Sequence, residues 1–175
     1  MISQKIDTAI REVPDFPKPG INFKDITTLL SDTSLSNEII DAFIERLKGK
    51  QIDAIVGVES RGFLFGFLLA SKMGVPFIPI RKVGKLPGET LKYKYDLEYG
   101  STEVEVHKSD VKEGWNVVVH DDLLATGGTA CAASELIQQL GADVAAFAFV
   151  ISLDYLKGNE KLEKYSKEII SLKKY

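Results

Sequence analysis

The sequence predicts an α/β fold in which a mostly parallel central sheet is flanked by helices. Short apolar, β-branched runs at residues 52–58, 117–119 and 143–152 indicate buried strands. Helical patterns follow the first two runs, at residues 63–73 and 129–140. The expected order is helix, helix, strand, helix, strand, hairpin, strand, helix, strand, which is typical of parallel strands joined by helices.

The start of the chain predicts one helix followed by a stiff loop. Pro14 should end the helix, Ser3 is its candidate N-cap, and its apolar face holds Ile6, Ile10 and Val13. Residues 14–25 contain three prolines and a glycine, so we expect no regular structure there. Because this loop carries Phe16 and Phe23, it could form a platform for a flat base.

The remaining elements show shorter patterns. We expect a helix over residues 36–48, a short strand over 76–80 and a half-exposed strand over 102–107. Between these strands, residues 81–99 are polar and basic, which predicts a mobile segment or a loose hairpin that can close over a polyphosphate. One short apolar run, residues 169–170, interrupts the charged C-terminal tail.

Composition limits the class of protein. The 175 residues suit a single domain, 1–175, and the net charge of −3 gives no global basic field for nucleic acid or anionic lipid. The single cysteine, Cys131, excludes an intramolecular disulfide framework. We find no signal-peptide core and no apolar run as long as a membrane span, so we expect a cytoplasmic protein.

The stretch from Val117 to Thr129 carries the clearest chemical signal. Asp121 and Asp122 are expected where the strand ends, and a turn with two glycines then leads into a helix that Gly141 should end. The unpaired N–H groups of such a turn bind phosphate well. The two carboxylates suit a ligand that also carries hydroxyl groups or a divalent cation. The stretch therefore predicts a site for a phosphorylated sugar.

A second strand–turn–helix unit has Glu59-Ser60-Arg61-Gly62 at its turn. Gly57 and Gly62 have the spacing of a nucleotide P-loop, but Phe63 stands where that motif needs lysine, which disfavours a nucleotide triphosphatase. Ser60, Arg61 and the turn amides can hold a diphosphate, whereas the alternative is a turn with an exposed arginine. Both turns follow the carboxyl ends of strands, where open α/β sheets bind ligands.

Several motifs together resemble the phosphoribosyltransferase family, and in particular its adenine branch, from Phe16 to about Lys161. They are Pro-Asp-Phe-Pro-Lys-Pro-Gly with Phe23, Glu-Ser-Arg-Gly-Phe, Arg-Lys-Val-Gly-Lys-Leu-Pro-Gly-Glu-Thr, Leu-Glu-Tyr-Gly and Asp-Asp-Leu-Leu-Ala-Thr-Gly-Gly-Thr. The last motif is shared across the wider family, whereas Lys-Leu-Pro-Gly and Leu-Glu-Tyr-Gly are specific to the adenine branch. The resemblance implies a type I, Rossmann-like fold with a base-binding hood at 1–35 and a flexible catalytic loop at 81–99.

The same resemblance implies a reaction and its partners. The 5-phosphoribosyl group of 5-phosphoribosyl-1-pyrophosphate (PRPP) would be transferred to adenine, giving AMP and pyrophosphate in purine salvage. Mg²⁺ would be the cofactor, held mainly by substrate oxygens near Asp121 and Asp122, with no side chain assigned as a direct ligand. The chain would form a homodimer whose basic loop reaches the partner's site, and neither nucleic acid nor membrane is expected as a partner.

Residue roles at the base follow from the resemblance. Phe23 would stack on adenine and the Asn22 backbone would read its edge, with Lys24 as a further contact. Glu98 would be the general acid, and Tyr99 would lie beside it in the closing loop.

Roles at PRPP follow in the same way. Asp121 and Asp122 would take the ribose hydroxyls, and the Glu59–Ser60 peptide is where the family tends to place a cis bond. Arg61 and Lys85 would act in catalysis on the leaving group. The pyrophosphate would be bound by Ser60 and Arg61, and by Arg81, Lys82 and Lys85 acting on the partner subunit's site. The 5-phosphate would be bound by Ala125, Thr126, Gly127, Gly128 and Thr129.

Three positions depart from the family pattern. Lys24 stands where arginine is usual, and Glu59 where aspartate is frequent. His120 replaces an apolar residue before the aspartates, and we expect it to fill a pocket rather than to titrate at the site.

Three other functions are weighed against this one. A related transferase could act on hypoxanthine, guanine or xanthine, but its site would have to accept a 6-oxo group. A PRPP-sensing regulator of the same fold would need an extra basic module to bind DNA, for which the chain has no room. A phosphoacceptor receiver domain would explain the paired aspartates but not Gly127-Gly128 or the basic loop.

Overall fold

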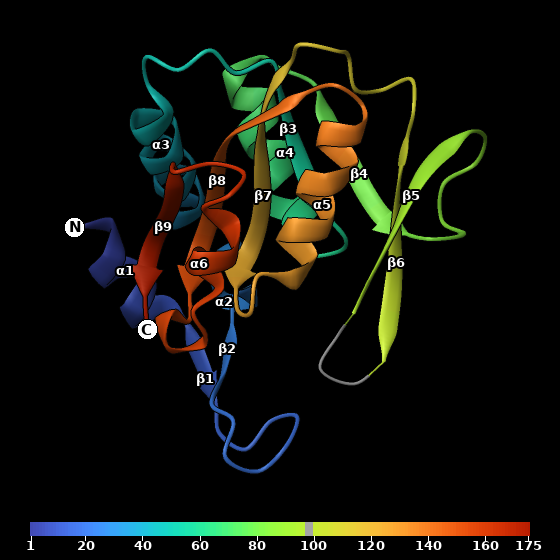
Figure 1. Cartoon of the computed structure of the whole chain (residues 1–175). Coiled ribbons are helices and arrows are strands. Elements are labelled where there is room, and N and C mark those ends of the chain that lie inside the picture. The colour runs from blue at the N-terminus through green and yellow to red at the C-terminus, as the bar shows by residue number, and fades with distance from the viewer. Residues whose placement is uncertain (97–99) are drawn as a thin grey trace.

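The computed structural model describes residues 1–96 and 100–175. Within them, the strands form a seven-stranded sheet of order β5-β6-β4-β3-β7-β8-β9 and a separate ribbon, β1-β2 (Figure 1). The helices are α1 (Ile2–Ala9), α2 (Thr27–Ser31), α3 (Thr33–Leu47), α4 (Gly62–Met73), α5 (Gly128–Gln139) and α6 (Gly158–Leu162), with a 3-10 turn at Asp154–Leu156. The strands are β1 (Arg11–Val13), β2 (Phe23–Asp25), β3 (Ala54–Val58), β4 (Phe77–Lys82), β5 (Thr90–Asp96), β6 (Ser101–His107), β7 (Asn116–Leu124), β8 (Asp143–Ser152) and β9 (Ile169–Lys174).

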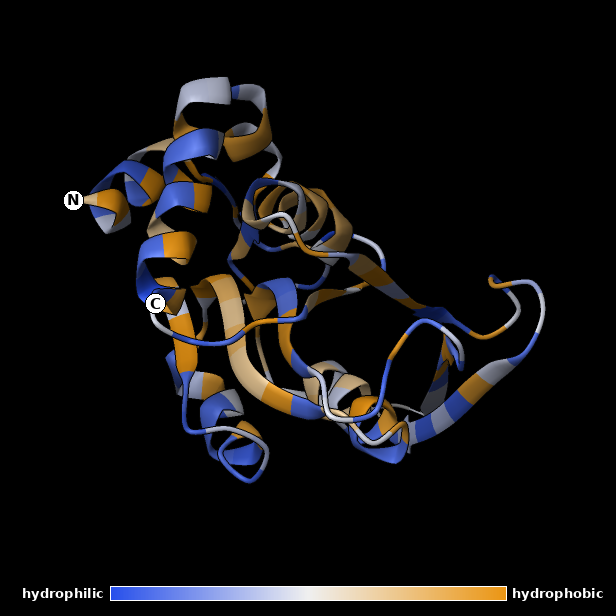
Figure 2. Cartoon of the chain, turned by 90° about the horizontal axis from the view of Figure 1, so that it is seen from above, coloured by the Kyte–Doolittle hydropathy of each residue, from blue (hydrophilic) through white to orange (hydrophobic). Residues whose placement is uncertain are grey.

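The centre of the sheet is parallel and covered on both faces. β3 pairs in parallel with β4 and β7, and β8 pairs in parallel with β7 and β9. One hydrophobic cluster joins the sheet to α1–α4, and a second joins the opposite face to α5 and α6. Figure 2 accordingly shows largely orange strands in the middle of the molecule. Every residue of β3 is buried because neither face meets water. The predicted α/β class is confirmed.

The N-terminal prediction is wrong in detail. Ser3 lies inside α1, and Met1 occupies the N-cap position without a side-chain cap. The helix ends at Ala9, before Pro14, and Val13 belongs to β1 rather than to the helix. β1 pairs antiparallel with β2, which lies in the segment expected to be irregular. Three-residue strands carry little periodicity, so their pairing depends on a partner distant in sequence.

The basic segment is more regular than predicted. β5 pairs antiparallel with β6 along its whole length, from Thr90 opposite His107 to Asp96 opposite Ser101. In Figure 1 this hairpin projects beside α5. Leu91, Tyr93 and Tyr95 pack against the core with exposed residues between them, a strand pattern that the abundant lysines obscured. The expected mobility of residues 81–99 stays a prediction.

Two further strands depart from expectation. β7 continues through Asp121 and Asp122 to Leu124, so the aspartates lie within the strand and not after it. The short apolar run at residues 169–170 begins β9, which completes the parallel sheet beside β8. β9 was missed because a six-residue edge strand with lysines at its end resembles a charged tail.

The longest helix described, α3, begins earlier than the predicted residue 36. Its N-cap is Asp32, whose carboxylate accepts the N–H of Leu35 at 2.9 Å. No helix in the described ranges is both long and apolar enough to cross a membrane.

His120 fills a pocket under the sheet, as predicted. Its side chain is fully buried on β7, and its ring meets that of Phe43 edge-on at 5.6 Å between centroids. Neither ring nitrogen has a hydrogen-bond partner among the described residues. Burial lowers the pKa of His120 to about 4, and the neighbouring Ala148 backbone offsets only part of this effect. The folded protein therefore holds a neutral imidazole at neutral pH.

His120 should make the protein less stable in weak acid. The unfolded chain takes up a proton below the ordinary histidine pKa of 6.5, whereas the folded chain resists protonation down to about pH 4. The free energy of unfolding should fall by about 2 kcal/mol between pH 7 and pH 5 from this group alone. Urea unfolding of the wild type and of His120→Leu at both pH values measures this, and the variant should lose this part of the pH dependence.

The matched control is His107→Leu, which removes the other histidine from the surface of β6. An equal loss of stability in the wild type and in His120→Leu would show that His120 is not responsible.

Candidate active site

The turn between β3 and α4 forms one wall of the site. It carries Glu59, Ser60 and Arg61, and its Glu59–Ser60 peptide is cis, as the resemblance implied. A Cβ on Gly62 would lie 3.0 Å from Oδ1 of Asp121 and 3.0 Å from the His120 carbonyl. Only a glycine lets this turn approach β7 so closely, so the first predicted turn lies against the strand that leads into the second.

The turn between β7 and α5 forms the opposite wall. Gly127 has φ +81° and is the N-cap of α5, which begins at Gly128. The first N–H groups of α5 have no partner within the helix, and the helix dipole is positive at this end. A cavity of about 80 Å³ lies at this turn and is lined by Asp121 and the residues from Leu123 to Ala130, with Phe149 behind them. Helix N-termini of this kind favour anions, and binding of a phosphate at this turn stays a prediction.

The two turns border a common cleft. A cavity of about 520 Å³ is lined by Glu59, Ser60, Arg61, Lys82, Asp121, Asp122, Leu123, Ala125 and Thr129. This volume is in the range of small-molecule sites. It shares Asp121, Leu123, Ala125 and Thr129 with the smaller cavity, so one ligand can reach both turns. If the two turns lay on different sides of the molecule, a single phosphorylated sugar could not touch both. The structure instead places them around one cleft.

The paired aspartates have different environments. Asp122 is buried, and its Oδ2 lies 2.9 Å from Nε of Arg61. Asp121 accepts the N–H of Asp122 at 2.8 Å, and the pKa of Asp121 is raised by burial and by the charge of Asp122. Like charges side by side resist ionisation together, so Asp121 takes up a proton more readily than an ordinary aspartate.

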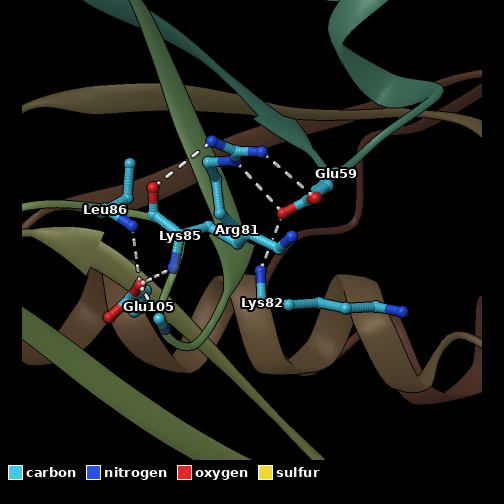
Figure 3. Close-up of polar contacts among 7 residues, drawn as sticks. Glu59, Arg81, Lys82, Lys85, Leu86 and Glu105 are labelled. Atoms are coloured by element: carbon cyan, nitrogen blue, oxygen red, sulfur yellow. Dashed lines mark hydrogen bonds and ion pairs between the residues drawn. The ribbon is translucent and has the colours of Figure 1, made fainter.

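The predicted basic residues are only partly in the cleft. Lys82 lines it, but the Arg81 guanidinium turns to Glu59, with Nε and Nη2 at 3.2 and 3.3 Å from its carboxylate (Figure 3). Arg81 also donates to the Lys85 carbonyl at 3.4 Å. Burial raises the pKa of Glu59, but the Lys82 N–H and the Arg81 guanidinium lower it more, so Glu59 is held ionised. In this structure Arg81 therefore organises the site and does not line it.

Sequence reasoning missed Glu105, which holds the turn bearing Lys85. This β6 carboxylate is only 2% exposed, and its Oε1 accepts the N–H groups of Gly84, Lys85 and Leu86 at 2.9–3.0 Å (Figure 3). Its Oε2 accepts the Thr90 hydroxyl at 2.9 Å. These donors lower its pKa despite burial. The alternating pattern of β6 suggested only a solvent-facing glutamate, because no local signal shows that a turn folds over it.

An aromatic cavity adjoins the cleft. It measures about 400 Å³ and is lined by Val13, Phe16, Phe23, Asp25, Thr27 and Arg61. The rings of Phe16 and Phe23 meet edge-on at 5.2 Å, and Cζ of Arg61 lies 5.6 Å from the Phe23 ring centroid. Because Arg61 borders both cavities, a flat group on Phe23 would lie next to a ligand in the cleft.

Two other predicted base contacts point elsewhere. Lys24 forms an ion pair with Glu12 and lies 4.1 Å from the Tyr175 ring centroid, and its side chain is 9% exposed. Nδ2 of Asn22 donates to Glu12 at 3.0 Å, which leaves the Asn22 backbone role untouched. Since side chains alternate along β2, Lys24 points away from the face that carries Phe23. The structure does not bring Lys24 to the cavity.

Glu98 and Tyr99 lie outside the described residues, so their predicted roles stay predictions.

A second residue that sequence reasoning missed, Gly158, supports the turn from Ala125 to Thr129, which we call the phosphate turn after its predicted ligand. A Cβ on Gly158 would lie 2.3 Å from the Ala125 carbonyl, and one on Gly127 would lie 2.9 Å from the Gly158 carbonyl. Gly158 begins α6, far along the chain from the turn it supports. A lone glycine in a polar tail gives no sequence signal for such a contact.

Comparison with known proteins agrees with this geometry. The phosphoribosyl transferase domain family matches residues 27–174. The chain is similar to an adenine phosphoribosyltransferase of Clostridium botulinum (strain Hall), with 54% identity over 166 residues and 95% of each chain covered.

Solved structures extend the likeness to the whole fold. The crystal structure of adenine phosphoribosyltransferase from Thermoanaerobacter pseudethanolicus matches with a TM-score of 0.95 and 49% identity over 100% of both chains. The enzyme of Saccharomyces cerevisiae, solved with adenine and an imino-altritol bisphosphate, matches with a TM-score of 0.92 and 44% identity over 98% of both. The chain therefore belongs to the phosphoribosyltransferase family and, within it, to the adenine phosphoribosyltransferases.

Proposed function

We propose that this chain transfers the 5-phosphoribosyl group of PRPP to adenine, releasing pyrophosphate and forming AMP for purine salvage. One observation carries the proposal. A single cleft joins the glycine-rich turn, the paired aspartates and Arg61, and Arg61 also borders the aromatic cavity. A phosphorylated, activated sugar and a flat base fit these neighbouring spaces.

PRPP is bound through its three parts. The turn from Ala125 to Thr129 takes the 5-phosphate on the N–H groups at the start of α5. The aspartates take the ribose hydroxyls, which can donate to a carboxylate, and the raised pKa of Asp121 lowers the cost of placing it near phosphate. Ser60, Arg61 and Lys82 take the pyrophosphate at the opposite end of the cleft.

The residues present fit Mg²⁺ held mainly by substrate oxygens. The described chain contains no cluster of three or more His, Cys, Asp or Glu side chains that could hold a metal ion. The cleft does present carboxylates from Glu59, Asp121 and Asp122. Mg²⁺ takes oxygen ligands and commonly uses one or two carboxylates together with substrate phosphates. When bound, it would neutralise charge on the leaving pyrophosphate.

Bond breaking at the anomeric carbon requires charge stabilisation and exclusion of water. Arg61 contacts Asp122 through Nε, so its terminal nitrogens can donate to the leaving pyrophosphate as its charge grows. Lys85 would assist from the turn held by Glu105. Glu98 would exchange a proton with N7 of the base, and closure of the 81–99 segment would keep water from the ribosyl cation.

Base choice rests on the aromatic cavity. Phe23 offers its ring to the purine, and the Asn22 backbone would read the edge that distinguishes adenine from 6-oxo purines. Lys24 makes no such contact here, since its side chain forms an ion pair with Glu12. Specificity for adenine would therefore come from backbone groups more than from this side chain.

A homodimer is supported by an apolar face on α4. Phe67 is 63% exposed and Leu64 46% exposed, and Phe63 and Phe67 both pack edge-on against Phe77. Contiguous exposed apolar side chains favour burial against another protein surface. A second copy is the partner we propose, with Lys85 reaching its cleft while Lys82 lines the cleft of its own chain. A cytoplasmic location stays a prediction.

Comparing adenine with 6-oxo purines as substrates tests the proposed reaction. Pyrophosphate release from PRPP and Mg²⁺ should be at least about 10²-fold faster (kcat/KM) with adenine than with hypoxanthine or guanine, because backbone groups aimed at adenine leave a 6-oxo edge unpaired. Comparable rates with a 6-oxo purine would assign the chain to another base.

The same assay tests whether Glu98 acts in catalysis. Glu98→Gln should lower kcat about 10²-fold, as expected for loss of a general acid or base, with little change in KM for PRPP. Near-normal turnover would remove Glu98 from the chemistry.

Gly158 should control binding of the 5-phosphate. In Gly158→Ala the new methyl group would meet the Ala125 carbonyl, so the phosphate turn must move. KM for PRPP should rise about tenfold or more, because small displacements of binding groups have large effects, while KM for adenine changes little. Glu160→Ala, an exposed position on the same helix, is the control. An unchanged KM for PRPP in Gly158→Ala would mean that α6 does not shape the turn.

The α4 face should determine assembly. Light scattering after size exclusion should give twice the chain mass for the wild type and a single-chain mass for Phe67→Glu, because a charge cannot be buried in an apolar interface without a partner. Lys72→Ala, near the end of the same helix, should remain dimeric. A monomeric wild type would exclude the dimer.

A further inference from the structure

Tyr95 reaches from the basic hairpin to the phosphate turn. Its hydroxyl oxygen forms a hydrogen bond with Oγ1 of Thr129 at 3.1 Å. Its ring is partly buried against the core and lies 3.8 Å from the position of a Cβ on Gly128. Tyr95 therefore lies beside the first two residues of α5, although it precedes Gly128 by 33 positions in the chain. No sequence motif pointed to this contact.

The contact with Tyr95 affects whether the Thr129 hydroxyl can donate its proton to a bound phosphate. Thr129 lines both the small cavity at the phosphate turn and the larger cleft. A hydroxyl has one proton to donate and lone pairs to accept with. If the threonine gave its proton to a neighbouring protein group, it could not donate to a phosphate oxygen. Accepting the Tyr95 proton leaves its own proton available for the ligand.

We propose that Tyr95 is a positioning residue that orients the Thr129 hydroxyl as a donor to the 5-phosphate of PRPP and AMP. Phosphate oxygens accept hydrogen bonds, so a bound phosphate requires the order Tyr95 hydroxyl to Thr129 hydroxyl to phosphate. The 3.1 Å distance between the two hydroxyl oxygens fits this order, because the Tyr95 hydroxyl can rotate to donate to Thr129. Each bond in such a chain polarises and strengthens the next. The inference rests on the proposed function, because it concerns the same phosphate site.

Tyr95→Phe removes the hydroxyl and keeps the ring. Losing one hydrogen bond of this kind should raise KM about 5- to 10-fold for PRPP and for AMP, which both carry the 5-phosphate. KM for adenine and for pyrophosphate, which lack it, should stay within about twofold, and so should kcat. The inhibition constant of ribose 5-phosphate, which carries the 5-phosphate but is not converted, should rise by the same factor as KM for AMP.

Two further variants distinguish a positioning role of Tyr95 from a general disturbance of the fold. Tyr93→Phe, two residues earlier on β5 and also packed on the core, should leave all constants unchanged. Thr129→Val should raise the same two KM values, and adding Tyr95→Phe to it should raise them little further, since the tyrosine acts through the threonine.

The outcomes that overturn the inference are distinct from those that overturn the reaction. Unchanged KM for PRPP and AMP in Tyr95→Phe would refute it, as would an equal rise for all four substrates or a full additional rise in the Thr129→Val background. A wild-type protein without activity on PRPP and adenine would instead refute the proposed function.

Discussion

The parallel pairing of β3 with β7 is the constraint on which the site depends. Gly57 lies opposite His120 in the ladder, so the turn after β3 and the second half of β7 emerge side by side. Neighbouring strands are separated by about 4.8 Å, which lets side chains from both turns meet over one ligand. The close contact at Gly62 and the Arg61–Asp122 ion pair then join the turn after β3 directly to β7, the strand that leads into the glycine-rich turn. A different strand order would separate the phosphate turn from Arg61 and leave two unrelated loops.

A half-buried and a buried carboxylate hold the basic segment beside this cleft in place. Glu59 accepts from Arg81 and from the Lys82 backbone, and Glu105 accepts from three successive N–H groups of the turn that carries Lys85. Hydrogen bonds to a carboxylate are stronger than neutral ones, so such contacts give firm geometry to a segment with few apolar anchors. The Lys82 side chain is then left to line the cleft.

The same hairpin connects to the phosphate turn through Tyr95 and Thr129. The phosphate turn is thus bounded by β7, by Gly158 at the start of α6 and by β5. Each of these elements comes from a different part of the chain. A helix N-terminus alone attracts anions, and three supports of this kind fix the shape of the turn that begins this helix.

Much of the fold and of the site followed from the sequence alone, because local pattern determines them. The apolar runs of β3, β7 and β8, the glycine-rich turn at Gly127-Gly128 and the paired aspartates could each be interpreted from neighbouring residues. Burial of His120 and the cis peptide at Glu59–Ser60 also agreed with expectation.

Only the tertiary structure decided the β1–β2 ribbon, the place of β9, the turning of Lys24 toward Glu12, and the contacts of Glu105, Gly158 and Tyr95. These features depend on partners brought together by folding, and a periodicity of side chains along one segment carries no information about a partner far along the chain.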